Sequence, residues 1–314
     1  MAHPIILIGG LGFVGRNILD ALSSNQEFSD LSPWVIDDLS NAAPGSGDLD
    51  VPVFTGQYQS ASALSFLEKI GDGPRTFVFL AGETRVAESK DRPLDFITAN
   101  IVDPSAFVTQ AVRAGDHFIL ISTAGALFDG TQEISISTPY CPKNFYGASK
   151  AAEEMVLEKL VDLQGAAFSV VRLTNVYGVH SVKKKSAIHA FTRAIISGET
   201  VTINGDGKQS RDFIFAGDVG FGVATQANRY RLGATVNRVN MLGSGVSTTL
   251  WDIVNAIETA AGTTLKYNQI PAEDLIRTEP RDVIANKDDV KILLGENVAS
   301  LTTGISKTYE YYAG

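Results

Sequence analysis

The chain has little cysteine, no excess of basic residues and no long apolar run, and each lack excludes a class of protein. Its one cysteine, Cys141, excludes a disulfide framework within the chain and a cysteine-rich metal site. Lys and Arg number 26 against 35 Asp and Glu, so the net charge of −9 predicts no nucleic-acid surface. No apolar run approaches the ~18 residues of a membrane span. The four histidines show no metal-ligand spacing, so no metal centre is expected.

The start of the chain also lacks a charged leader followed by an apolar segment and a cleavage site. We therefore expect a soluble, cytoplasmic, globular protein. Its 314 residues, 44% of them hydrophobic, are enough for a substantial core in one large domain or one and a half.

The first half of the sequence alternates short apolar runs with amphipathic stretches. The apolar runs are nearly continuous and rich in Val, Ile and Phe, which is typical of strands covered on both faces. We expect strands at 5–8, 34–37, 51–54, 76–82, 117–122 and 168–173. We expect helices at 13–23, 61–70, 94–114 and 146–163. This alternation predicts an α/β fold with a doubly wound parallel (Rossmann) sheet.

The regular alternation ends at about residue 177. A Gly- and charge-rich turn followed by a strand is expected over 203–215, a capped helix over 248–262, and the end of a short helix at 290–295. We therefore expect a Rossmann domain over residues 1–176 and a smaller mixed α/β substrate lobe over 177–314. The two are expected to be interleaved rather than joined by a linker.

A glycine-rich stretch follows the first expected strand and opens a helix. It fits two patterns, Gly10-x-Gly12-x-x-Gly15 and the wider Gly9-x-x-Gly12-x-x-Gly15. Glycines allow a tight turn and the close approach of a phosphate, and the helix N-terminus offers N–H groups to a pyrophosphate. The alternative is an ordinary strand-to-helix turn.

An acidic residue stands where a dinucleotide site needs one. Asp37 ends the second expected strand, 22 residues after Gly15. A carboxylate there accepts hydrogen bonds from the adenine-ribose hydroxyls and repels a 2′-phosphate. No Arg or Lys follows closely, so the sequence favours NAD over NADP.

A tyrosine and a lysine open the helix expected at 146–163. Tyr146 and Lys150 are four residues apart and therefore share a helix face. A lysine cation beside a phenol favours the phenolate and is expected to lower the Tyr146 pKa towards neutrality. Ser122 and Thr123 end a strand, at the edge where open α/β sheets bind ligands. A surface tyrosine, a solvated lysine and an unremarkable strand end are the alternative.

Several motifs along nearly the whole chain combine into one resemblance. They are Gly9-x-x-Gly12-Phe13-x-Gly15, VIDDLSNA (35–42), FLAGETRVAES (79–89) with Pro93 and Asn100, STA (122–124), YGASKAAEE (146–154), VVRLTNVYG (170–178) and INGDGKQSRDFIFAGDV (203–219). The chain resembles the extended short-chain dehydrogenase/reductases, in particular nucleotide-sugar epimerases of the UDP-galactose 4-epimerase kind. The resemblance favours the wider glycine spacing.

The resemblance implies roles for individual residues. Thr123 matches the family's catalytic hydroxyl, with Ser122 as the alternative, Tyr146 is the acid/base, and Lys150 holds the nicotinamide ribose. The NAD contacts implied are Gly9, Gly12, Phe13, Val14, Gly15, Asp37, Asp38, Leu39, Gln57, Tyr58, Leu80, Ala81, Gly82, Thr84, Asn100, Tyr146, Lys150 and Thr174. The substrate contacts implied are Thr123, Tyr146, Asn175, Arg211 and Arg281. A homodimer through the helices at 94–114 and 146–163 is also implied.

Some positions depart from the family pattern. Gln57 and Tyr58 follow Gly56 where an acid usually meets the adenine, and Thr84 stands where some epimerases carry a lysine. Arg277 and Arg281 are both candidates for a second diphosphate contact. Arg211, the first candidate, could instead pair with Asp212. The lysine run at 183–185 either helps to hold a nucleotide diphosphate or is a solvated loop.

The resemblance implies NAD-dependent inversion at C4 of a nucleotide-diphosphate hexose through a 4-keto sugar. A 4,6-dehydratase of the same family needs an acid and a base after Thr123, where Ala124 and Gly125 stand, unless Asp129, Glu83 or Cys141 substitutes. A nucleotide-sugar reductase or dehydrogenase is a further alternative. A non-catalytic NAD-sensing scaffold is disfavoured by the Thr123, Tyr146 and Lys150 set.

Overall fold

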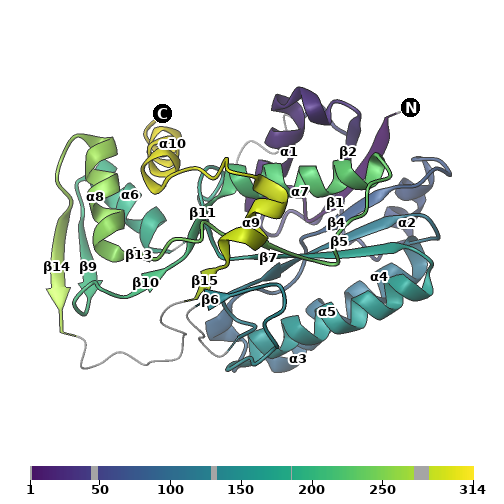
Figure 1. Cartoon of the computed structure of the whole chain (residues 1–314), viewed down its shortest axis with the longest axis horizontal. Helices are drawn as coiled ribbons and strands as arrows, with labels where there is room; N and C mark the ends of the chain where they lie inside the picture. The colour runs from purple at the N-terminus through teal and green to yellow at the C-terminus, as the bar shows by residue number, and fades with distance from the viewer. Residues whose placement is uncertain (1, 44–48, 129–132, 185, 272–282) are drawn as a thin grey trace.

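The computed structural model describes residues 2–43, 49–128, 133–184, 186–271 and 283–314. It has two parts, a sheet with helices on both faces and a smaller group of helices and short strands beside it (Figure 1). Among the described residues, no helix combines the length and the apolar character needed to cross a membrane.

A parallel sheet of seven strands forms the larger part. Its strand order is β12-β7-β5-β4-β1-β2-β3. From β1 the chain first adds strands on one side and then on the other, as in a doubly wound fold. The strands are β1 (His3–Ile8), β2 (Leu31–Asp37), β3 (Val53–Thr55), β4 (Thr76–Phe79), β5 (His117–Thr123), β7 (Ala167–Leu173) and β12 (Val239–Leu242).

Helices cover both faces of this sheet (Figure 1). One face carries α1 (Phe13–Ser24), α7 (Ala216–Arg231) and α9 (Lys287–Leu294). The other carries α2 (Ala61–Glu68), α4 (Asp103–Ala111) and α5 (Phe145–Leu163). Successive strand residues point to opposite faces, so Ile5 and Leu7 join the first core while Ile6 and Ile8 join the second. This two-sided burial explains the continuous apolar runs.

The smaller part has its own apolar core. Its helices are α6 (Ala187–Ser197), α8 (Leu250–Ala261) and α10 (Leu301–Ala313), and β9 (Thr200–Asn204) pairs parallel with β14 (Lys266–Ile270). Short strand pairs continue it: β10 (Ser210–Arg211) with β13 (Thr248–Thr249), β11 (Phe213–Phe215) with β8 (Asn175–Tyr177), and β15 (Ile284–Ala285) with β6 (Glu133–Ile134).

Three features differ from the sequence expectations. The helix expected at 94–114 is three segments, α3 (Pro93–Ile97), a π-helical turn (Thr98–Val102) and α4, and it ends at Ala111. The strand β12 was not expected, because it is short and lies in the part of the chain where the alternation has ended. The strand expected at 76–82 is shorter and ends at Phe79.

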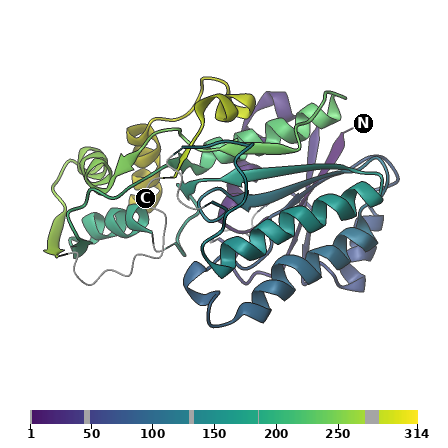
Figure 2. The same cartoon turned by 60° about the horizontal axis from the view of Figure 1, so that its bottom comes forward.

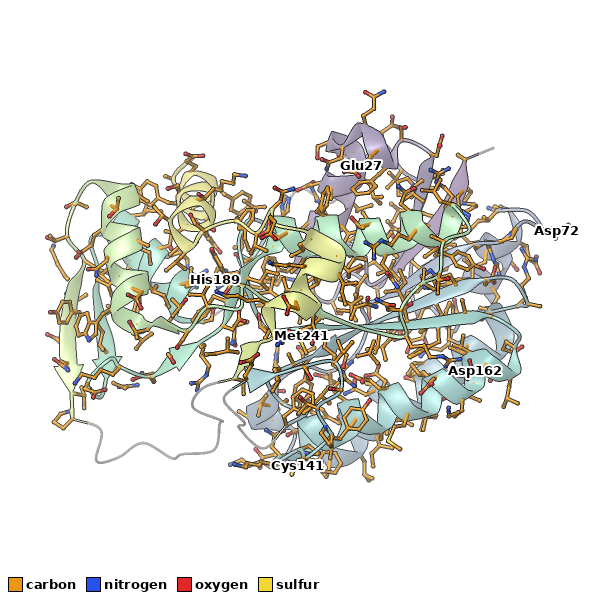
Figure 3. The ribbon with its side chains drawn as sticks, in the orientation of Figure 1. Glu27, Asp72, Cys141, Asp162, His189 and Met241 are labelled. Atoms are coloured by element: carbon orange, nitrogen blue, oxygen red, sulfur yellow. The ribbon has the colours of Figure 1, made fainter. Side chains whose placement is uncertain are left out.

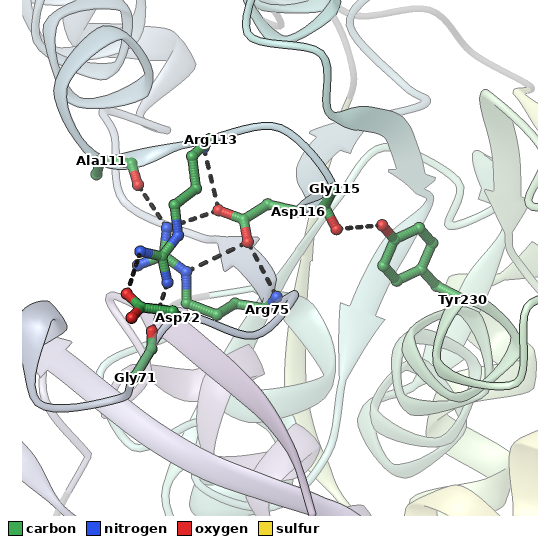
Figure 4. A network of polar contacts seen from close by, with 8 residues as sticks. All are labelled: Gly71, Asp72, Arg75, Ala111, Arg113, Gly115, Asp116 and Tyr230. Carbon is green, nitrogen blue, oxygen red and sulfur yellow. Dashed lines mark hydrogen bonds and ion pairs between the residues drawn. The ribbon is translucent and has the colours of Figure 1, made fainter.

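A polar network centred on the buried residues Arg75 and Asp116 lies at the amino ends of β4 and β5 (Figure 4). Arg75, directly before β4, pairs with Asp116, directly before β5, with 2.6 Å between Nη2 and Oδ2. Arg113 donates its backbone N–H to the same carboxylate at 3.1 Å, and the Tyr230 hydroxyl donates to the Gly115 carbonyl oxygen. This network fixes the end of the sheet that is opposite to the carboxyl ends.

Candidate active site

The carboxyl ends of the parallel strands bring the predicted residues to one edge of the sheet. Ile8 pairs with Ile36 and with Phe79, so the glycine turn, Asp37 and the segment at Leu80 start side by side. Leu80 donates its backbone N–H to Ile8 O at 2.9 Å. This edge, at a strand-order reversal, is where such sheets bind ligands.

The glycine turn is shaped for close approach of a ligand. Gly9 has φ +78°, and a Cβ on Gly15 would lie 2.4 Å from Gly10 O, so both positions require glycine. At Gly12 the nearest heavy atoms to an added Cβ are Gly9 O at 3.4 Å and Asn41 O at 4.0 Å, so the protein itself would accept a methyl group there. Helix α1 starts at Phe13 with no capping side chain and no acid in its first turn. Its N–H groups therefore suit a pyrophosphate, and the turn fits NAD.

Asp37 connects the glycine turn to the second strand. Its carboxylate accepts the Leu11 N–H at 2.9 Å and the Leu39 N–H at 2.8 Å. Burial raises the pKa of this carboxyl, against the effect of the two hydrogen bonds. Asp38 is exposed and accepts the Gln57 amide at 3.0 Å. Asp38, Leu39 and Gln57 thus lie together beside Asp37.

Two other predicted cofactor residues, Ala81 and Tyr58, lie in different environments. A Cβ on Gly9 would lie 3.2 Å from the Ala81 N, so Ala81 borders the glycine turn. Tyr58 instead packs its ring edge-on against Phe79 and Phe107, with ring centroids 5.3 and 5.5 Å away, within the core.

Asn100 is buried inside the π-helical turn. Its Oδ1 accepts the Glu83 N–H at 2.8 Å, while its Nδ2 donates to Glu83 O at 3.1 Å and to Ser149 Oγ at 3.2 Å. Glu83 follows Gly82 in the segment after β4, and Ser149 lies on α5. Asn100 therefore joins the segment around Gly82 and Thr84 to the helix that carries Tyr146 and Lys150.

The predicted catalytic residues meet where β5 ends and α5 begins. Asn144 caps α5 by accepting the Gly147 N–H at 2.8 Å, which places Tyr146 in the first turn. Tyr146 is buried and is hydrogen-bonded to the Thr123 hydroxyl. Lys150 donates from Nζ to Ile121 O at 3.2 Å.

The other strand-end hydroxyl differs from Thr123. Ser122 Oγ is buried and has no hydrogen-bond partner among the described residues. The structure therefore places Thr123, rather than Ser122, on the phenol of Tyr146.

The net shift of the Tyr146 pKa is opposite to the sequence expectation. Burial raises the pKa of the Tyr146 phenol above its ordinary value, although the Lys150 cation and the Thr123 hydrogen bond both lower it. The expected lowering towards neutrality is therefore wrong for the protein without ligand. The contribution of Lys150 has the expected sign, but desolvation outweighs it.

Sequence reasoning missed two acidic residues next to the catalytic pair. Glu153 is fully buried and lies within ion-pair distance of Lys150 Nζ. Glu154 pairs with Arg172 on β7, with 2.9 Å between Oε2 and Nη2, and accepts the Tyr140 hydroxyl at 2.7 Å. Spacing along α5 could have suggested Glu153, because it lies one turn after Lys150.

The predicted substrate residues lie where the two parts of the molecule meet. Asn175 donates its Nδ2 to Asp212 O at 3.0 Å, and the Thr174 hydroxyl donates to Asp212 Oδ1 at 3.2 Å. The Asp212 carboxylate also accepts the N–H groups of Ser244, Gly245 and Ala285. Arg211 is half-buried and donates to Ser210 O at 2.8 Å. Arg277 and Arg281 lie outside the described residues.

The lysine run approaches the cofactor side of the site. Lys183 donates to Ser40 O at 3.3 Å, and Lys184 Nζ lies 5.6 Å from the centre of the Phe13 ring. Both side chains are exposed, and Lys185 lies outside the described residues.

Of the three residues considered as substitute acids for a dehydratase, the structure describes Cys141 and Glu83. Cys141 is exposed, at the lower edge of the molecule in Figure 3. Glu83 Oε1 lies 3.8 Å from Arg92 Nη2, and Asp129 lies outside the described residues.

Comparison with known proteins agrees with this geometry. A family model described as the NAD dependent epimerase/dehydratase family matches residues 5–241. The chain is a member of this family. The membership confirms the expected cofactor, NAD, and the expected enzyme class. The family includes both epimerases, the favoured prediction, and dehydratases, the first alternative.

Known members of the epimerase/dehydratase family carry out both reactions. A UDP-glucose 4-epimerase of Mycolicibacterium smegmatis is 26% identical, over 98% of this chain and 97% of its own. A dTDP-glucose 4,6-dehydratase of Xanthomonas campestris is 27% identical, over 74% of this chain and 70% of its own. The structure of the Thermotoga maritima UDP-glucose 4-epimerase with UDP-glucose superposes with a TM-score of 0.84, at 24% identity and 98% coverage of both chains. That likeness confirms the doubly wound fold.

Proposed function

We propose that the protein inverts C4 of a nucleotide-diphosphate hexose, with UDP-glucose and UDP-galactose or their N-acetylated forms as the substrate class. The observation that carries this choice is the pair of residues after Thr123. Ala124 is fully buried and Gly125 has no side chain, so neither supplies the acid and base of a dehydratase. The 4-epimerases among the relatives support the same reaction.

In this proposal the chain holds NAD and moves one proton. Bound NAD would supply reversible hydride transfer at C4. Tyr146, as phenolate, removes the proton of the C4 hydroxyl and later returns it. Thr123 orients the phenol, and the Lys150 cation stabilises the phenolate. Arg211 holds the diphosphate in a bidentate contact, so the keto sugar turns while the nucleotide stays in place.

The residues that hold each ligand are part of the proposal. The substrate is held by Thr123, Tyr146, Asn175, Arg211 and Arg281. Residues 1–176 mainly bind NAD, and residues 177–314 mainly bind the substrate. The proposed NAD contacts are Gly9, Gly12, Phe13, Val14, Gly15, Asp37, Asp38, Leu39, Gln57, Tyr58, Leu80, Ala81, Gly82, Thr84, Asn100, Tyr146, Lys150 and Thr174.

We also propose that the protein is a homodimer through α3, α4 and α5, which form an outer layer of the molecule (Figure 2). Large apolar side chains are exposed on these helices and the π-helical turn: Leu94, Val102, Met155 and Leu163, at 72%, 54%, 57% and 80% of their surface. An apolar surface of this kind is typical of a protein interface. The cytoplasmic location stays a prediction.

The reaction is tested by proton NMR of the purified protein with UDP-glucose and no added cofactor. The C4 epimer is the expected product, and a 4-keto-6-deoxy sugar would overturn the proposal in favour of the dehydratase. Tyr146→Phe should fold normally and lose about 10²–10⁴-fold in kcat. The control is Tyr267→Phe, on the edge strand β14, which should keep wild-type activity. Equal activity in Tyr146→Phe would exclude the proposed mechanism.

A further inference from the structure

Glu153 is a buried acid that the proposed reaction does not use. None of its side chain is exposed, and 6% of the Lys150 side chain is exposed. Its Oε2 forms an ion pair with Lys150 Nζ, while its Oε1 has no hydrogen-bond partner among the described residues. A carboxylate in this position is costly to bury unless a cation compensates it. The structure therefore commits part of the charge of Lys150 to Glu153.

The groups that face Glu153 come from several elements. On α5 itself these are the adjacent Glu154, Lys150 one turn before Glu153, and Tyr146 two turns before it. From the segment after β3, Tyr58 faces it: burial raises the Tyr58 pKa, and the charges of Asp103 and Glu153 raise it further. Glu154 is committed to Arg172 on β7. Lys150 is thus the cation that Glu153 contacts within the described part of the chain.

Glu153 and the Tyr146 phenolate compete for the same cation. Lys150 lowers the Tyr146 pKa, whereas the negative charge of Glu153 raises it. Burial raises the pKa of Glu153 to about 7, although Lys150 acts against this shift. Protonation of Glu153 near neutral pH removes its negative charge, so Lys150 then acts on the phenol without compensation.

We propose that Glu153 is a positioning residue that acts through Lys150. When Glu153 is ionised, it holds the Lys150 ammonium and weakens the support that this ammonium gives to the Tyr146 phenolate. When Glu153 is protonated, it releases the ammonium. This rests on the proposed role of Tyr146 as the acid/base. Glu153 is not among the proposed ligand contacts, and it sets how much of the Lys150 charge reaches the phenol.

The test follows Tyr146 directly, by a pH titration of tyrosinate absorption in the protein as purified. Subtracting the titration of Tyr146→Phe isolates the signal of this phenol from those of the other tyrosines. Glu153→Gln should lower the Tyr146 midpoint by about one pH unit or more, because it removes a negative charge close to the phenol–lysine pair. Glu153→Asp, which keeps the charge, should keep the midpoint near that of the wild type.

Glu158→Gln is the matched control, since Glu158 lies on the same helix and pairs with Arg238 at the surface. It should leave the midpoint unchanged. A Glu153→Gln protein that melts at a lower temperature but keeps the wild-type midpoint would show a merely structural residue and overturn the proposal.

A second variant covers the case in which Glu153→Gln does not fold. Lys150→Met leaves Glu153 as a buried acid without its cation, so its pKa rises further above the value of an unfolded chain. The folded state then binds more protons than the unfolded state, and stability falls as pH rises through and above about 7. A melting temperature of Lys150→Met that follows the wild-type pH dependence would overturn the ion pair.

Neither readout needs turnover. If NMR shows no epimerisation, the proposed reaction fails while the absorption titration still decides the role of Glu153. If epimerisation is present, the acid limb of its pH profile should move to lower pH in Glu153→Gln together with the absorption midpoint.

Discussion

At the scale of single residues, Asp37 does two things with one carboxylate. It accepts backbone N–H groups from both Leu11 and Leu39, and it lies where the adenine ribose is proposed to bind. The two backbone contacts fix the orientation of the carboxylate before any ligand arrives. A carboxylate oriented in this way loses little entropy when it accepts ribose hydroxyls.

Asp37→Asn should weaken NAD binding by roughly 10–100-fold, because hydrogen bonds to a charged acceptor become bonds to a neutral amide. Calorimetric titration of cofactor-free protein with NAD measures the change. Wild-type affinity for NAD should also fall as the pH drops towards the pKa of Asp37, which burial raises above its ordinary value. The exposed Asp38→Asn variant is the comparison and should lose less affinity. Undiminished NAD affinity in Asp37→Asn would contradict the proposed ribose contact.

Residues with a local signature could be predicted from the sequence. The glycine turn, Asp37, and the Tyr146–Lys150 spacing each follow from a pattern of neighbours along the chain. The spacing places Glu153 beside Lys150, but its burial could not be predicted, because nothing in a run of helix-forming residues says that a glutamate is fully buried. The predicted direction of the Tyr146 pKa shift was wrong for the same reason, because desolvation depends on the residues that pack over the phenol.

At the scale of elements, the glycine turn contains two glycines with different roles, Gly15 and Gly12. Gly15 is required by the crossing of α1 over the turn, because a Cβ there meets the Gly10 backbone at 2.4 Å. A Cβ on Gly12 would make only ordinary van der Waals contacts within the protein, and the residue has an ordinary backbone conformation, with φ −72°. The first serves the fold, and the second keeps room for the ligand.

We therefore expect different outcomes from two substitutions of the same size. Gly15→Ala should destabilise the protein by about 1–3 kcal/mol, because the backbone must shift to accept the methyl group. Gly12→Ala should keep the wild-type melting temperature without ligand but lose most NAD binding, because its methyl group occupies the space of the pyrophosphate. Thermal unfolding of each variant with and without NAD separates the two. Equal stabilisation of Gly12→Ala and wild type by NAD would contradict the placement of the pyrophosphate.

Most helices and strands of the first half could be predicted from the sequence, but the positions of their ends were predicted less well. Apolar alternation located six of the seven sheet strands, because burial on both faces leaves a continuous run. The π-helical turn around Asn100 was not predicted, and the hydrogen-bond partners of Asn100, Glu83 and Ser149, are distant from it in sequence. The strand β12 was missed because it lies after the regular alternation of strands and helices has ended.

At the scale of the whole molecule, the exposed apolar side chains on the outer helices predict an assembly. Met155→Glu places a charge within the proposed α5 interface, and desolvating it would oppose association. We expect wild type to be dimeric and Met155→Glu monomeric by light scattering, with the folded protomer unchanged. Tyr267→Glu is the control, since Tyr267 is exposed on β14, away from α5, and should remain dimeric. A wild-type monomer, or a dimeric Met155→Glu, would contradict the proposed interface.

The position of β12 also has a consequence for synthesis. This strand completes the sheet beside β7, yet it enters the chain at Val239, after more than two thirds of the protein has been translated. Until then the nascent chain carries β7 as an unpaired edge, a template for pairing with other chains. Newly made protein should therefore depend on chaperones until β12 emerges from the ribosome, and truncations before Val239 should accumulate as aggregates.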